Sequence, residues 1–391
     1  MKYDFDTVID RRGSDSLKYD ALESRYGDAD LLSLWVADMD FATPDFIIEA
    51  LQRRLDHPVL GYSIVPEDYW PSVIDWIEAR HDYRVEPEWL SYIPGIVKGI
   101  GFVIDLFTKP GDKVIIQPPV YHPFRIVTES MGRKVVNNPL IEANGTYRMD
   151  FEQLESVIDG CKLLILSNPH NPAGVVWSKE DLKRLAKLCH ERGVIVVSDE
   201  IHSDMPLFGA DHHVFTSVSK DAEEIGIVFG APTKTFNMAG VVSSYSIVPN
   251  PELREKFYSW LEASELCDPN MFAPIATTAA FRQGNPWREQ MLEYVEENVR
   301  FVEDYCGENI PQVKPWRPQA SFLVWLDCRA LGLNHKELNE LFVKEARLAL
   351  NDGEMFGKEG AGFMRLNIGC SRATLRLALN RLKEAVNNIS H

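Results

Sequence analysis

Hydrophobic and polar positions alternate in blocks through the middle of the chain. Between Lys109 and Asp199, short runs that are almost wholly apolar are separated by segments with a helical period of apolar residues. Ser178, followed by Asp181 three residues later, predicts the start of one such helix by the capping-box pattern. Strands that are apolar on both faces and separated by helices are typical of a mainly parallel sheet covered by helices, so we predict an α/β fold. The predicted strands are residues 113–117, 135–136, 163–166, 194–197 and 225–230.

The pattern on either side of this block predicts two further parts. Residues 1–45 form an arm that is rich in aspartate and aromatic residues and has no helical period. Residues 286–391 combine helices with two apolar strands, which predicts a smaller α+β domain that includes part of the arm. We therefore predict an arm at 1–45, a large domain at 46–285 and a small domain at 286–391. The two predicted strands of the small domain are 321–326 and 363–368. The remaining predicted helices begin next to Pro44, Pro66, Ile96, Pro251, Pro286, His335 and Ser371. Of these, 251–282 and 335–350 are each predicted as one continuous helical stretch.

Composition narrows the class of protein. The 391 residues are 45% hydrophobic and 25% charged, which is ordinary for a globular protein, and the length favours two or three domains. A net charge of −17 argues against a nucleic acid or an anionic membrane as partner, since basic patches bind both. No apolar run approaches the roughly 20 residues of a bilayer span, and the charged N-terminus lacks the apolar region of a signal peptide. The six widely spaced cysteines fit reduced thiols and no metal site, so we expect a cytoplasmic protein.

Polar residues follow three consecutive strands of the predicted sheet. Asn171 follows the third predicted strand, Asp199 and His202 follow the fourth, and Lys234 follows the fifth. Ligands of parallel sheets bind beyond the carboxyl ends of the strands, so we expect these side chains in one site. Each has an ordinary structural alternative: a rigid turn at Asn171, a helix cap at Asp199, a packed imidazole at His202 and a loop lysine at Lys234. One shared site explains all of them more simply.

Lys234 lies in an unusual place for a charged side chain, in the segment 231–240 that directly follows an apolar strand. Loss of water lowers the pKa of a lysine ammonium and frees the amine to attack a carbonyl group. The carbonyl that we expect is the aldehyde of pyridoxal 5′-phosphate (PLP). A solvated lysine in a surface loop is the alternative.

Two further features suit anionic groups. Pro94 and Gly95 lead into the predicted buried helix at Ile96, and the free N–H groups of such a first turn suit a phosphate. Arg365 lies in the middle of a predicted small-domain strand, where a guanidinium is costly to bury unless it is paired. It suits either a substrate carboxylate or a salt bridge between the domains.

Taken together, these segments resemble the PLP-dependent enzymes of the aspartate-aminotransferase fold, class I and II. The resemblance covers nearly the whole chain and rests on NPHNPAG (168–174), SDEIH (198–202), the Lys234 segment and FMRLN (363–367), in the order of that family. It implies a large domain with a mainly parallel, seven-stranded sheet between helices, and a smaller α+β domain. It also implies an amino acid as the substrate and a homodimer whose active sites are shared between subunits.

The resemblance implies a role for each matching residue. Lys234 would bind PLP covalently and then move the α-proton of the substrate, and Asp199 would hold the protonated pyridine nitrogen. Tyr121 would stack on the ring, and Asn171 would bind the ring hydroxyl. His202 stands where typical aminotransferases have a tyrosine that donates to the ring oxygen. The phosphate would meet Ile96, Val97, Thr233 and, from the neighbouring subunit, Tyr62; the substrate would meet Arg365 through its carboxylate, together with Asn171, Ala37 and His122.

Other segments resemble one branch of this family, the MalY/PatB-type C–S lyases. They are WVADMDF (35–41), GYS (61–63), PVYHPF (119–124) and DEIHSD (199–204). Such enzymes remove the α-proton of cystathionine or cysteine and expel a thiolate from Cβ, which yields pyruvate and ammonia. His122 departs from this pattern, because many of these lyases have a second aromatic hydroxyl after Tyr121. An imidazole there could still relay a proton.

Two alternatives to the lyase stay open on the sequence. An aminotransferase of class I or II would begin with the same Lys234 step, so only the surrounding residues separate the two reactions. A regulatory protein on the same fold would act through a protein partner, and nothing in the chain identifies one. Arg372 is a second cation near Arg365, which we interpret as structural or as part of the rim of the site.

Overall fold

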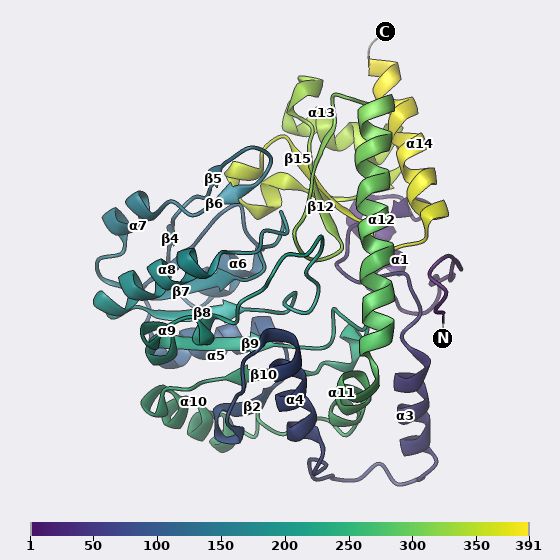
Figure 1. The fold of residues 1–391 in the computed structure, drawn as a ribbon. Coiled ribbons are helices and arrows are strands. Elements are labelled where there is room, and N and C mark those ends of the chain that lie inside the picture. Colours follow the sequence, from purple (N-terminus) through teal and green to yellow (C-terminus); the bar gives the residue numbers. More distant parts are fainter. Residues whose placement is uncertain (1, 390–391) are drawn as a thin grey trace.

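A seven-stranded sheet forms the centre of the larger part of the molecule, in the order β2-β10-β9-β8-β7-β3-β4 (Figure 1). It is seen in a computed structural model that describes residues 2–389. β10 runs antiparallel to both of its neighbours, and the pairs from β9 to β4 are all parallel. The predicted α/β fold with a mainly parallel, seven-stranded sheet is therefore confirmed. The strands are β2 (Leu90–Ile93), β10 (Ser244–Ile247), β9 (Gly226–Gly230), β8 (Ile195–Asp199), β7 (Cys161–Ser167), β3 (Lys113–Ile116) and β4 (Lys134–Asn137).

A second, four-stranded sheet lies in the C-terminal part of the chain, in the order β11-β12-β15-β14, with antiparallel pairs. Figure 1 shows this sheet above the large one. Its position agrees with a small α+β part within 286–391, while the exact domain boundaries stay a prediction. The strands are β11 (Lys314–Trp316), β12 (Leu323–Asp327), β15 (Phe363–Asn367) and β14 (Asn351–Asp352), and two short pairs join β1 (Leu32–Ser33) to β13 (Leu348–Ala349) and β5 (Ile141–Glu142) to β6 (Tyr147–Arg148).

Helices surround both sheets, and α12 runs beside the small part in Figure 1. No helix within residues 2–389 is long and apolar enough to cross a membrane. The helices are α1 (Leu17–Asp20), α2 (Leu22–Tyr26), α3 (Asp45–Leu55), α4 (Tyr69–His81), α5 (Ile96–Phe107), α6 (Pro123–Ser130), α7 (Phe151–Val157), α8 (Lys179–Glu191), α9 (Lys220–Ile225), α10 (Pro251–Ala263), α11 (Phe272–Gln283), α12 (Asn285–Asn309), α13 (His335–Glu340) and α14 (Arg372–Ile389).

The central strand β7 shows why the sequence of this sheet is so apolar. Leu163 and Ile165 pack into one buried cluster together with α5, whereas Leu164 and Leu166 pack into another together with α8. Successive side chains of a strand point to opposite faces, and here both faces are covered by helices. Polar residues are therefore confined to the strand ends, where the chain leaves the two clusters.

Three predicted segments differ from the structure. The arm contains α1 and α2, and its strand β1 pairs in parallel with β13, although residues 1–45 have no helical period. The helix predicted for 335–350 leaves α-geometry after Glu340, continues as a π-helical turn and then becomes β13, because Leu348 and Ala349 pair with the arm. The stretch 251–282 is two helices, α10 and α11, with an interruption between them.

Candidate active site

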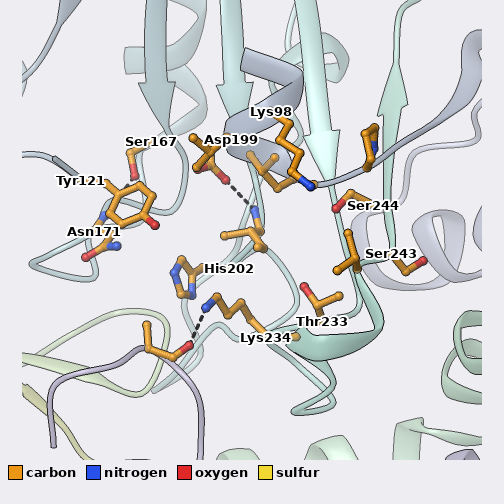
Figure 2. A pocket seen from close by; sticks show the side chains of 18 residues that line it. Lys98, Tyr121, Ser167, Asn171, Asp199, His202, Thr233, Lys234, Ser243 and Ser244 are labelled. Carbon is orange, nitrogen blue, oxygen red and sulfur yellow. Dashed lines mark hydrogen bonds between the residues drawn. The ribbon is translucent and has the colours of Figure 1, made fainter. Parts of the chain in front are cut away.

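A cavity of about 320 Å³ opens beyond the carboxyl ends of β7, β8 and β9 (Figure 2). Because β7, β8 and β9 are parallel neighbours, the loops that follow them meet at one edge of the sheet. The sequence rule that grouped these strand ends is therefore confirmed by the geometry. Nine of the predicted site residues line the cavity: Ala37, Ile96, Val97, Tyr121, Asn171, Asp199, His202, Thr233 and Lys234.

Lys234 reaches into this cavity from the loop after β9. Its Nζ donates a hydrogen bond of 2.5 Å to the carbonyl oxygen of Ala37, and its side chain is partly buried. Burial lowers the pKa of Lys234 to about 8, against the opposing pull of Asp38 and Asp199. A substantial fraction of this amine is thus neutral near pH 8, which is the form that attacks a carbonyl.

Asp199 lies at the end of β8, and Figure 2 shows His202 beside the amine end of Lys234. The Asp199 carboxylate accepts the N–H of Ile201 at 3.2 Å, and burial raises its pKa to about 7. A cation placed beside Asp199 would restore its charge, because an opposite charge lowers a carboxyl pKa. Burial lowers the pKa of His202 to about 3, and its Nδ1 has no hydrogen-bond partner within residues 2–389. His202 is therefore a neutral imidazole with a free hydrogen-bonding atom next to the cavity.

Arg365 is buried beside the cavity and has no acidic partner among the described residues. Its guanidinium donates to Oδ1 of Asn171 at 3.0 Å, to Oδ1 of Asn351 at 2.6 Å and to the carbonyl oxygen of Trp35 at 2.9 Å. Its Nε is buried without a hydrogen-bond acceptor. The predicted alternative of a salt bridge between domains is thus wrong, and a buried positive charge held only by neutral groups suits an incoming carboxylate.

The N-terminus of α5 forms another wall. Gly95 precedes the helix with a φ of 114°, a conformation that L side chains rarely adopt, and no side chain caps the helix start. The N–H groups of Ile96 and Val97 belong to the first turn, which has no intrahelical acceptors. The hydroxyl-bearing Thr233 lines the same cavity, so an anionic group can bind here.

The arm segment 35–41 covers Lys234 and is fixed from both parts of the molecule. Asn237, three residues after Lys234, accepts the N–H of Met39 and donates to the carbonyl oxygens of Met39 and Phe41. Asn367 from the small sheet donates to the carbonyl oxygens of Val36 and Asp38, each at 2.6 Å. The backbone of Ala37 is thereby held against the lysine amine.

A buried carboxylate that sequence analysis left without a role supports the strand ends. Glu200 accepts hydrogen bonds from Nδ2 of Asn168, the hydroxyl of Ser198 and the N–H of Phe215, and its second oxygen lies 2.9 Å from Nε2 of His212. It thus joins the loop that carries Asn171 to the end of β8. The acidic residue directly after Asp199 was the available signal, but the sequence alone does not show which way it points.

Three predicted residues do not line the cavity. Tyr62 is fully exposed in the loop between α3 and α4, away from the site of its own chain. His122 lines a separate cavity of about 220 Å³ that has Tyr121 as a shared wall, and burial lowers its pKa to about 4. The His122 imidazole is therefore neutral at pH 7. Arg365 is the third, and it contacts the cavity wall through its hydrogen bond to Asn171. Arg372, the second predicted cation, donates instead to Asn298 on α12 and has a structural role.

Four lining residues with polar side chains were missed by sequence analysis, namely Lys98, Ser167, Ser243 and Ser244. Ser167 lies at the end of β7, and its hydroxyl accepts the N–H of Asn171 at 3.0 Å. Its place at a strand end was the signal that could have identified it. Ser244 begins β10 and Ser243 directly precedes it. This strand runs antiparallel to its neighbours, so the rule for parallel strands does not find these residues.

Comparison with known proteins settles the family. The family model "Aminotransferase class I and II" matches residues 29–382. The chain belongs to this family. Cystathionine beta-lyase PatB of Bacillus subtilis (strain 168) is 44% identical over 384 residues, 98% of this chain and 99% of that protein. Protein MalY of Escherichia coli (strain K12) is 32% identical over 388 residues, with 98% and 99% of the two chains covered.

A solved structure extends the likeness to the whole fold of this aminotransferase-family chain. Cystalysin from Treponema denticola, whose crystal structure contains PLP, superposes with a TM-score of 0.95 at 34% identity, over 99% of this chain and 100% of that one. The predicted resemblance, including its lyase branch, is confirmed. The side chains of the cavity also fit PLP. The partly buried Lys234 suits its aldehyde, and the Asp199 carboxyl, whose pKa burial raises, suits its cationic ring nitrogen. The first turn of α5 suits its phosphate.

Proposed function

We propose that this protein is a PLP-dependent C–S lyase that cleaves sulfur amino acids such as cystathionine or cysteine by α,β-elimination. The observation that carries the proposal is the buried Arg365, which has no acidic partner among the described residues and is bonded to Asn171 beside Lys234. An amino acid bound through its carboxylate at Arg365 would present its Cα to the Lys234 amine. The 44% identity to a cystathionine beta-lyase supports the choice of reaction.

Each predicted residue that lines the cavity has a part in this proposal. Bound at Lys234, PLP supplies the electron sink that stabilises negative charge at Cα. Asp199 would hold the ring nitrogen in its protonated form, and Asn171 and His202 would bind the ring hydroxyl. Ile96, Val97 and Thr233 would bind the phosphate. Tyr121, whose pKa is raised by burial, stays protonated and provides a ring surface and a hydroxyl.

Lys234 then performs the proton transfer. Once the amino group of the substrate has replaced it on PLP, the neutral Lys234 amine would accept the proton from Cα. The Cα–H electron pair would become the Cα=Cβ bond, and the Cβ–S pair would leave with the thiolate, which takes up a proton. Ala37, held by the arm, keeps the amine directed into the site. Addition of one water to the released enamine gives pyruvate and ammonia, so one thioether and one water yield one thiol, one pyruvate and one ammonia.

A homodimer with shared sites is part of the proposal. The loop between α3 and α4 exposes Val59, Leu60, Tyr62 and Ile64 in a single chain, and Figure 1 shows it at the edge of the molecule. Apolar side chains that cluster in an extended, exposed loop are typical of a surface that another chain covers. Tyr62 would then reach the phosphate of the neighbouring subunit.

The position of sulfur in the substrate tests this reaction. L-cystathionine carries a sulfur on Cβ, whereas L-methionine carries it on Cγ, where α,β-elimination cannot release it. We expect pyruvate, ammonia and homocysteine in equal amounts from L-cystathionine, no pyruvate from L-methionine, and no product with Lys234→Ala. A 2-keto acid without thiol release would favour the second candidate, an aminotransferase, which the broad family also contains.

A further inference from the structure

Lys98 is the one lining residue whose charge the proposed chemistry does not use. It lies in the first turn of α5, is exposed, and lines the cavity together with Lys234. Figure 2 shows its side chain beside Ser244, on the opposite side of the cavity from Tyr121 and Asn171. Within residues 2–389 its ammonium forms no hydrogen bond or ion pair. Lys98 therefore stands at the end of the cavity formed by the N-terminus of α5.

This is an unfavourable place for a cation in the empty protein. The N-terminus of a helix carries partial positive charge, so a lysine in the first turn is repelled rather than stabilised. Lys109 lies just beyond the C-terminus of α5, where the partial negative charge of the helix end favours a cation. A lysine that no carboxylate neutralises, at the positive end of a helix and beside a cavity, is explained if an anion binds there.

The charges of the lining residues identify the anion. Lys98 and Lys234 are the lysines of the cavity wall, and no arginine lines it. Lys234 is committed to the aldehyde of PLP, at the other end of the cofactor from its phosphate. A phosphate ester carries nearly two negative charges at pH 7, and the backbone N–H groups and Thr233 offer it only neutral donors.

We propose that Lys98 binds the PLP phosphate and supplies its fixed positive counter-charge. The proposal rests on the PLP-binding part of the proposed function, but not on which reaction follows. It adds a side-chain cation to a phosphate site otherwise made of amide and hydroxyl groups. It also predicts that this cation stabilises the PLP-bound protein alone, and not the apoprotein.

The test compares two ligands that differ only in the phosphate, PLP and pyridoxal. Equilibrium titration of apoprotein with each gives dissociation constants for the wild type, Lys98→Met, Lys98→Arg and the control Lys109→Met, which removes the same charge from the other end of α5. We expect Lys98→Met to weaken PLP binding about tenfold, as for loss of one charged hydrogen bond, and to leave pyridoxal binding within about twofold. Lys98→Arg should restore most of the affinity, and Lys109→Met should change neither constant.

Thermal unfolding of the apoproteins supplies a second readout. Lys98→Met should be at least as stable as the wild type without PLP and less stabilised by added PLP. Equal weakening of PLP and pyridoxal, or unchanged PLP binding, would overturn the role of Lys98. A wild-type protein that binds neither ligand at Lys234 would contradict the proposed function itself, whereas PLP binding without lyase activity would leave Lys98 tested and only the reaction in error.

Discussion

At the scale of single residues, burial explains the chemistry of the site. It lowers the pKa of Lys234 to about 8 and raises that of Asp199 to about 7, which brings both groups into a range where a ligand can change their charge. Sequence analysis identified both residues, because a strand end next to an apolar run is a poor place for a charge. It missed Lys98, since an exposed lysine on a helix has no distinguishing pattern.

The lowered pKa of Lys234 gives a pH dependence for capture of PLP by the apoprotein. The neutral amine is the reactive form, so the rate should rise as the pH increases through about 8 and level off above it. The growth of the visible absorbance of lysine-bound PLP, followed by stopped flow, measures this rate. A lysine with ordinary solvation would show a rate that still rises steeply near pH 10.

Arg365→Met tests carboxylate capture. Loss of a buried, hydrogen-bonded charge pair costs about 2–5 kcal/mol, so we expect kcat/KM for L-cystathionine to fall by about two to three orders of magnitude. PLP binding should change little. Arg372→Met is the matched control, because Arg372 contacts Asn298 and lies outside the cavity; it should leave KM unchanged. Equal effects of the two substitutions on KM would remove Arg365 from the substrate site.

At the scale of elements, the loops after three parallel strands position the residues of the site, and the arm covers Lys234. The strand-end rule predicted the positions of Asn171, Asp199 and Lys234 because topology fixes them. The clamp on segment 35–41 could not be predicted, since Asn237 and Asn367 reach it from parts of the chain that are remote in sequence. The same limit explains the wrong helix at 335–350, whose last residues pair with the arm.

Asn237→Ala tests whether the arm holds the site together. Three side-chain hydrogen bonds to the arm are lost, so we expect unfolding free energy to fall by about 2 kcal/mol and KM to rise. Asn237 has a φ of 51°, so Asn237→Ala also introduces backbone strain. Asn237→Gly removes the same amide without that strain, and it therefore separates the loss of the hydrogen bonds from the strain. Asn380→Ala, which removes an exposed contact with Tyr305, is the control. If Asn237→Gly restores KM, the arm is not held by the amide.

At the scale of the whole molecule, the proposed dimer completes each site. Tyr62 is remote from the cavity of its own chain, and the family resemblance alone identified it, because no pattern within one chain predicts a residue that acts in another. The large and small parts were predictable from the switch between apolar runs and mixed segments. The way in which two copies meet was not, since exposed apolar residues in a loop do not specify their partner.

Mixed dimers test the shared site. Tyr62→Ala and Lys234→Ala chains are each expected to have little activity, since one lacks the phosphate contact and the other the amine. Co-expressed in equal amounts, they form about half mixed dimers, each with one complete site, so about a quarter of wild-type activity should return. Activity of the mixture equal to the mean of the two separate variants would mean that each site is built within one chain.

The number of turnovers per chain decides the central proposal most directly. Purified holoprotein is mixed with excess L-cystathionine, without any added 2-keto acid. The amount of pyruvate formed is then measured as equivalents per protein chain. An elimination regenerates the cofactor in each cycle, so pyruvate should accumulate to many equivalents per chain, with equal ammonia. Formation of a 2-keto acid that stops at one equivalent per chain, as the cofactor becomes aminated, would contradict the lyase and identify an aminotransferase.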